Sequence, residues 1–149
     1  MEECGLFDEE LLAAEDIELF GRICVRWKVA RVPEVLMVRT EGTHNITANG
    51  RKMNDYSILA FEKIIDREPD LPPSVRRTLD KELGRQHWWR GYLTFKNGSP
   101  EQARTDLWRA IQYDKGYLRA GSTLILASFL PRAIVNRLQA RGRSRKVNA

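Results

Sequence analysis

Hydrophobic positions in the first third of the chain follow a helical period and then a β-like one. Apolar residues recur at helical spacing behind an acidic cluster, which the positive end of a helix dipole favours, so we predict a helix over about residues 13–26. Two β-rich runs follow, residues 28–32 and residues 35–39. Because Pro33 separates them and limits pairing there, we expect edge strands or one interrupted strand. The helical positions are Ile17, Phe20, Cys24 and Trp27.

The second third of the chain begins with another helical pattern and then a proline-rich break. Apolar stripes between Met53 and Ile65 predict a well-buried helix. The prolines of residues 68–74 favour an extended backbone and push the residue before each of them out of the helical region. We therefore divide the chain into residues 1–70 and residues 71–149. The expected fold class is α+β and mostly helical.

Residues 71–149 are predicted to be all helical. The sequence Asn97-Gly98-Ser99-Pro100 ends one helix and begins the next, which predicts a helical hairpin. Its small-residue spacing is similar to that of one tetratricopeptide hairpin, in which small side chains let two helices approach closely. Residues 116–140 predict one or two further helices, broken at Pro131. The small-residue positions are Gly91, Ala103, Leu107 and Ala110.

Composition places the chain among globular proteins. It has 149 residues, 42% hydrophobic and 30% charged, which is enough for one ordinary domain or two small ones. Two cysteines, Cys4 and Cys24, give neither a disulfide framework nor a metal-binding cluster, so we expect a reducing, cytoplasmic location. The start of the chain is acidic, unlike a signal peptide, and the longest apolar stretch is too short to span a bilayer.

The net charge of +5 is unevenly distributed. Eight of the 20 acidic residues precede the first basic residue, Arg22, whereas no acidic residue follows Asp114 and eight basic residues do. The basic tail lacks interleaved aromatics and any groove-binding motif, so we expect no nucleic acid partner. A solvated tail and contact with an acidic membrane surface both remain open.

Motifs for common self-contained enzymes are absent from the sequence. It has no P-loop, no dinucleotide-binding glycine motif, no nucleophile elbow and no Asp-x-Asp, and its two histidines are too few for a His-rich metal site. The one notable constellation is the set of acids in residues 5–22. From the residues alone, adjacent acids at the first turn of a helix are usually dipole partners and caps.

The order of several short motifs adds a second interpretation. Gly-x-Phe-Asp-Glu begins at Gly5, Glu-Asp-x-Glu-Leu-x-x-Arg ends at Arg22, Val-Pro-Glu-Val-Leu covers residues 32–36, and a loop ends in Asn-Ile-Thr at residues 45–47. This order resembles the C-terminal half of family-two glycosyltransferases, which have an A-type nucleotide-sugar fold. Many members continue into a helical tail, which is sometimes tetratricopeptide-like.

The resemblance implies roles for four residues. Asp16 corresponds to the family's general base, which takes the proton from the acceptor hydroxyl as that hydroxyl attacks the anomeric carbon of the donor sugar. Phe7, Asp8 and Glu15 correspond to the acceptor side of the active site. Family members often carry a histidine where this chain has Gly42, so we expect no metal in the nearby loop.

The family's N-terminal half, which holds the nucleotide and carries the metal-binding Asp-x-Asp, has no counterpart in this sequence. We therefore expect a fragment of an inverting glycosyltransferase that is inactive alone, either from a truncated reading frame or as one piece of a split enzyme. A divalent metal, Mg²⁺ or Mn²⁺, is implied for the full-length family member and no cofactor for this chain. The expected acceptor is a sugar, with lipid-linked sugars included, and the membrane surface is a candidate partner. The alternative function is a helical protein-interaction module.

Overall fold

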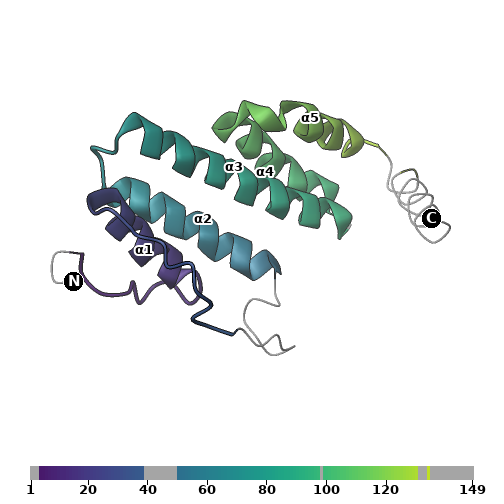
Figure 1. The fold of residues 1–149 in the computed structure, drawn as a ribbon. Helices are drawn as coiled ribbons and strands as arrows, with labels where there is room; N and C mark the ends of the chain where they lie inside the picture. Colours follow the sequence, from purple (N-terminus) through teal and green to yellow (C-terminus); the bar gives the residue numbers. More distant parts are fainter. Residues whose placement is uncertain (1–3, 39–49, 98, 131–133, 135–149) are drawn as a thin grey trace. The chain divides into compact units, whose positions relative to one another are not determined.

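The computed structural model describes residues 4–38, 50–97, 99–130 and 134 (Figure 1). They fall in two compact units that divide between Leu83 and Gly84, within the third helix. None of the described helices is long and apolar enough to cross a membrane. The elements in chain order are α1 (Glu15–Arg26), α2 (Gly50–Arg67), α3 (Pro73–Lys96), α4 (Pro100–Tyr113), the 3₁₀ turn η2 (Lys115–Tyr117) and α5 (Leu118–Ala127).

The expected α+β class is wrong, because the described residues contain helices and no strand. Residues 28–38, predicted to form two strands, have no regular structure and are exposed throughout; residue 39 lies outside the described part. A strand needs a partner for its backbone and a covered face, and the described chain gives this segment neither. The A-type glycosyltransferase fold implied by the resemblance is therefore not the architecture of the described residues.

The first unit is built on the packing of α1 against α2, which lie side by side in Figure 1. Both helices confirm the periodicity predictions, although α1 begins two residues later than expected and α2 extends beyond its apolar stripes at both ends. The contact is close at Gly21, where a Cβ atom would lie 2.3 Å from Cδ1 of Ile64. Ile64 is completely buried, so a side chain at Gly21 would have to displace the core.

The second unit contains the C-terminal part of α3 together with α4, η2 and α5. Gly91 lets α3 and α4 approach, because a Cβ atom there would lie 2.9 Å from Cγ of Leu107. Leu107 belongs to a buried cluster with Phe95 and Ala103, which α5 covers with Leu124 and other side chains. The predicted break at Pro131 and almost all of the tail beyond it lie outside the described residues, as do residues 39–49.

A buried polar cluster joins α3 to α4 in the second unit. His87 is fully buried, and its Nδ1 lies 3.0 Å from Oδ1 of Asp106, while Arg90 Nε donates to Oδ2 of Asp106 over 2.9 Å. Burial by itself raises the pKa of Asp106, but the hydrogen bonds from His87 and Arg90 outweigh burial and lower it. The cluster holds these two helices in register.

Candidate functional site

The motif residues before α1 form a tight turn organised by Asp8. Gly5 begins it in the left-handed region, with φ of 71°. Asp8 then accepts two hydrogen bonds from the chain that follows: Glu10 N–H donates to its Oδ1 over 3.0 Å, and Leu11 N–H donates to its carbonyl oxygen over 3.0 Å. A side-chain carboxylate that bonds the backbone two residues later fixes a turn locally.

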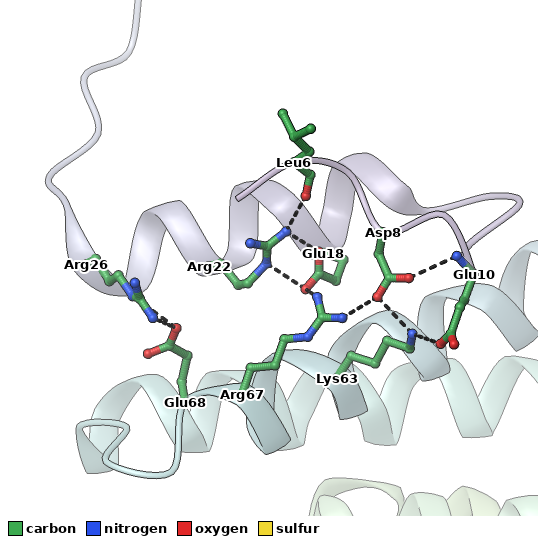
Figure 2. Close-up of polar contacts among 9 residues, drawn as sticks. All are labelled: Leu6, Asp8, Glu10, Glu18, Arg22, Arg26, Lys63, Arg67 and Glu68. Atoms are coloured by element: carbon green, nitrogen blue, oxygen red, sulfur yellow. Dashed lines mark hydrogen bonds and ion pairs between the residues drawn. The ribbon is translucent and has the colours of Figure 1, made fainter. Parts of the chain in front are cut away.

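Two cationic side chains on α2 bind the carboxylates of this turn and hold the turn against that helix (Figure 2). Lys63 Nζ lies 2.8 Å from Oδ2 of Asp8 and also pairs with Glu10, and Arg67 Nη2 donates to the same Asp8 oxygen. The hydrogen bond from Lys63 is the largest influence on the Asp8 carboxyl and, with help from Arg67, outweighs the effect of burial, so its pKa falls to about 2. Asp8 is therefore ionised, and its charge holds the turn on α2.

A second carboxylate, Glu18, has no exposed surface and lies between two arginines (Figure 2). Arg22 donates from Nε to Oε1 over 2.7 Å and from Nη2 to Oε2 over 2.8 Å, a two-pronged arrangement, and Arg67 reaches Oε1 from α2. Arg22 also donates to the carbonyl oxygen of Leu6 over 2.9 Å. Every charge buried here has a partner, which is the condition for tolerating charges inside a protein.

Ala14 links the turn to the start of α1 in an unusual backbone conformation. Its φ of 61° lies in the left-handed region, which costs an alanine roughly 1–2 kcal/mol. Packing against Leu11 and Ala60 in a buried cluster holds it there. Strained residues persist where the surroundings dictate them, often at functional sites, and this one directs Glu15 and Asp16 into the first turn of α1.

Asp16, like Glu9, is exposed and has no cationic partner among the described residues, whereas Asp8 and Glu18 are held in ion pairs. Its Oδ1 accepts its neighbour's amide, Ile17 N–H, over 2.8 Å. Glu15 beside it is half-buried, and Phe7 is 54% exposed on the turn. An accessible carboxylate on a rigid support can accept a proton from a bound hydroxyl.

The four residues assigned by resemblance thus lie in one unit but in different environments. Phe7 and Asp16 are open to solvent, Glu15 is half-buried, and the side chain of Asp8 is only 5% exposed inside the ion-pair network. The acceptor contact of Asp8 stays a prediction.

The residues that sequence reasoning missed are Lys63 and Arg67 on α2. Their spacing of four puts two cations on one helix face, which was the available signal. Their partners lie more than forty-five positions earlier in the chain, so no local pattern linked the two sets of charges.

The described residues do not fit a metal ion. No three His, Cys, Asp or Glu side chains in the described ranges lie close enough to form a ligand set, and the neighbouring carboxylates of Asp8, Glu10 and Glu18 already pair with lysine or arginine. His44 and the loop around it lie outside these ranges. We therefore assign no chemical step of this chain to a metal.

Comparison of the chain with protein-family models, with curated proteins and with solved structures gives no match. The class of protein must therefore be argued from the motif order and from the geometry around Asp16.

Proposed function

We propose that this chain supplies the acceptor-binding part of an inverting glycosyltransferase that uses a nucleotide-sugar donor, with Asp16 as the general base. One observation supports the proposal: among the acids of the motif, Asp8 and Glu18 are committed to ion pairs, whereas Asp16, like Glu9, is exposed and has no cationic partner within the described chain. The motif order adds the chemistry, because it resembles that of family-two glycosyltransferases and places the base at this position.

In the proposed reaction, Asp16 accepts the proton of the acceptor hydroxyl while the hydroxyl oxygen attacks the anomeric carbon of the donor sugar. The new carbon–oxygen bond forms on the face opposite the diphosphate, so the configuration inverts, and the nucleoside diphosphate leaves with the electron pair of the broken bond. Phe7 offers an exposed ring on which a sugar can stack, and Glu15 can accept a hydrogen bond from another acceptor hydroxyl.

The network beneath these residues has a positioning role in this proposal. Asp8 and Glu18 hold the turn and α1 against α2, so Phe7 and Asp16 stay in one arrangement as substrate binds. The donor and its divalent metal belong to a donor-binding polypeptide that carries the Asp-x-Asp motif. We expect turnover only when that polypeptide is present.

The cellular setting is part of the same proposal. Cys4 and Cys24 are both free thiols, and a reducing cytoplasm would keep them in that form. A lipid-linked sugar acceptor would bring the chain to the membrane surface, where the basic residues after Pro131 can meet acidic headgroups. Those residues lie outside the described part, so this contact rests on their charge alone.

The test is turnover by this chain joined to the donor-binding part of a family-two glycosyltransferase, followed as release of the nucleoside diphosphate. We expect Asp16→Asn to lower turnover by about 10²-fold or more, because the amide fills the same volume and cannot accept the proton. The melting temperature should stay nearly unchanged. Asp66→Asn on α2 is the matched control, since Asp66 is also exposed and has no assigned role.

Equal turnover of the wild type and Asp16→Asn would end the proposal. If Asp16 only complements the dipole of α1, its substitution costs at most about 1 kcal/mol of stability and leaves turnover unchanged. Glu15→Gln separates binding from chemistry, because loss of an acceptor contact raises KM for the acceptor more than it lowers kcat.

A helical interaction module remains the second candidate, favoured by exposed aromatic side chains in the second unit. Trp89 and Tyr92 on α3 and Trp108 on α4 are 36–56% exposed, and aromatic residues of this kind dominate protein interfaces. A specific protein partner whose binding is lost in Trp108→Ala, together with turnover indifferent to Asp16→Asn, would favour this function over the transferase.

A further inference from the structure

The second unit is strongly basic, whereas the first is acidic. From Gly84 to the end, the chain has 13 basic and 3 acidic residues, whereas residues 1–83 have 12 basic and 17 acidic ones. One of the three acids, Asp106, is buried and paired with Arg90, so it does not reduce the positive charge at the surface. A partner that binds this unit through charge must therefore be acidic.

The C-terminal end of α5 carries exposed hydrophobic side chains, which we call the α5 tip. Leu126, Phe129 and Leu130 make up the tip and are 69%, 65% and 39% exposed. Their neighbours Leu124 and Ile125 pack instead against the buried cluster of the second unit. Clustered apolar side chains at a surface mark a place where another molecule binds.

The α5 tip is fixed to α4, which packs against α5 (Figure 1). Arg104 on α4 donates from Nε to Oγ of Ser128 over 2.8 Å and from Nη2 to the carbonyl oxygen of Ser128 over 3.0 Å. The central carbon of the same guanidinium lies 3.8 Å from the centre of the Phe129 ring, a cation–π contact. The unit therefore holds an apolar surface and a positive charge side by side.

The exposed face of α5 combines a base with apolar residues. Arg119, Thr123, Leu126 and Leu130 recur at helical spacing and are all exposed. On α4, Trp108 is 56% exposed, and tryptophan is enriched where proteins meet the membrane–water interface. Apolar side chains with bases beside them are typical of elements that lie in a membrane surface.

An acidic lipid surface fits this combination better than a nucleic acid does. Single-stranded nucleic acids bind to basic grooves in which bases stack on aromatic rings, and they would leave Leu126 and Leu130 in water. A lipid surface covers such leucines with acyl chains and pairs the bases with its headgroups. The tip is followed at once by residues 131–149, which have six basic residues and no acidic one. An apolar anchor plus a polybasic segment supplies the two signals that stable membrane contact requires.

We infer that the α5 tip inserts into the surface layer of an acidic membrane, while Arg104, Arg119 and the basic tail meet the headgroups. The inference rests on the membrane contact included in the proposed function, and it assigns that contact to named side chains. With ten residues, α5 is too short to span a bilayer, so its place is at the surface.

The test is co-sedimentation of the full chain with lipid vesicles of phosphatidylcholine, with and without phosphatidylserine. We expect the vesicles that contain phosphatidylserine to bind the chain about tenfold or more tightly than the neutral ones, and raised salt should weaken this binding. Equal binding to both kinds of vesicle, or no binding to the acidic ones, would overturn the inference.

Leu126→Ser and Leu36→Ser form a matched pair of variants, because Leu126 and Leu36 are 69% and 77% exposed. Leu126→Ser should weaken vesicle binding by about tenfold, since it removes apolar surface that the acyl chains cover, and Leu36→Ser in the first unit should leave binding unchanged. Both variants should keep the circular dichroism and melting temperature of the wild type.

Three results of this comparison would overturn the inference. Unchanged binding in Leu126→Ser would show that charge alone attracts the chain to the vesicle. An equal loss in Leu36→Ser would show that any exposed leucine serves. Unfolding by Leu126→Ser would show that this leucine supports the core of the second unit.

Arg119→Gln and Arg51→Gln test the basic part of the surface, because both arginines are exposed and only Arg119 lies on α5. Arg119→Gln should weaken vesicle binding by about fivefold and Arg51→Gln should have little effect. A single-stranded oligonucleotide or polyglutamate that binds as tightly as the acidic vesicles, with vesicle binding indifferent to Leu126→Ser, would put a nucleic acid or an acidic protein in the place of the membrane.

Failure of this inference can be told apart from failure of the proposed function. Vesicle binding that depends on Leu126, with turnover indifferent to Asp16→Asn, would keep the membrane contact and remove the catalytic role. Turnover that depends on Asp16, with vesicle binding indifferent to Leu126→Ser, would keep the catalytic role and remove the contact.

Discussion

Replacing Glu18 by glutamine tests whether the buried ion pair stabilises the first unit. Glu18 is completely buried, accepts two hydrogen bonds from Arg22 and pairs with Arg67. The glutamine keeps the volume and one acceptor oxygen, but it leaves the positive charge of Arg22, whose side chain is 9% exposed, without its counterion.

The expected loss follows from that burial. Removing one partner of a buried pair destabilises a protein by about 3–5 kcal/mol, and we expect the lower end because glutamine still accepts one hydrogen bond. For a unit of this size, about 3 kcal/mol corresponds to a fall in melting temperature of roughly 15 °C.

The matched control is Glu68→Gln, at a more exposed pair of the same two residue types. Glu68 pairs with Arg26, whose side chain is 42% exposed, so the substitution should cost less than about 1 kcal/mol. Urea unfolding followed by circular dichroism at 222 nm gives both free energies. Equal losses for the two variants, or a loss below about 1 kcal/mol for Glu18→Gln, would refute the reasoning that burial gives this network its strength.

Three further predictions concern charge, packing and ligand binding. The folded-state pKa of Asp8 is about 2, below the unfolded value near 3.9. Its contribution to the free energy of unfolding should therefore be complete above about pH 5 and disappear as the pH falls towards 2. Urea unfolding at a series of pH values should show that Asp8→Asn loses less stability on acidification than the wild type does. Gly91→Ala should destabilise the chain by about 1–2 kcal/mol, although alanine has the better helix propensity. The reason is that the added methyl group would press on the fully buried Leu107. A gain in melting temperature would contradict the close approach of α3 and α4. The chain alone should release no heat when titrated with uridine, guanosine or thymidine diphosphate sugars, and micromolar binding would reveal a donor site within it.

Helices could be predicted from the sequence because their signal is local. The apolar spacing of α1 and the stripes of α2 lie within single segments, and Ser99-Pro100 marks the start of α4 directly. The strand prediction at residues 28–38 was wrong because β propensity describes what a residue prefers once a sheet exists. Whether a partner strand is present cannot be determined from the segment itself.

In the candidate site, too, local features could be predicted from the sequence and contacts between distant residues could not. Gly5, Asp8 and Asp16 could be singled out because turn chemistry and motif order are local properties of the sequence. The network that supports them depends on Lys63 and Arg67, which meet Asp8 and Glu18 only after α1 has packed against α2. Glu18 has no role assigned from the motif order, and only its complete burial identifies it as the centre of the scaffold.

The most direct test of the account is turnover by this chain joined to a donor-binding part, measured beside the melting temperature for the wild type and for Asp16→Asn. The account predicts a loss of turnover of about 10²-fold or more with a nearly unchanged melting temperature, because the amide keeps the volume of the side chain but cannot accept the proton. Equal turnover of the two proteins, with any loss confined to stability, would contradict the assignment of Asp16 as the base.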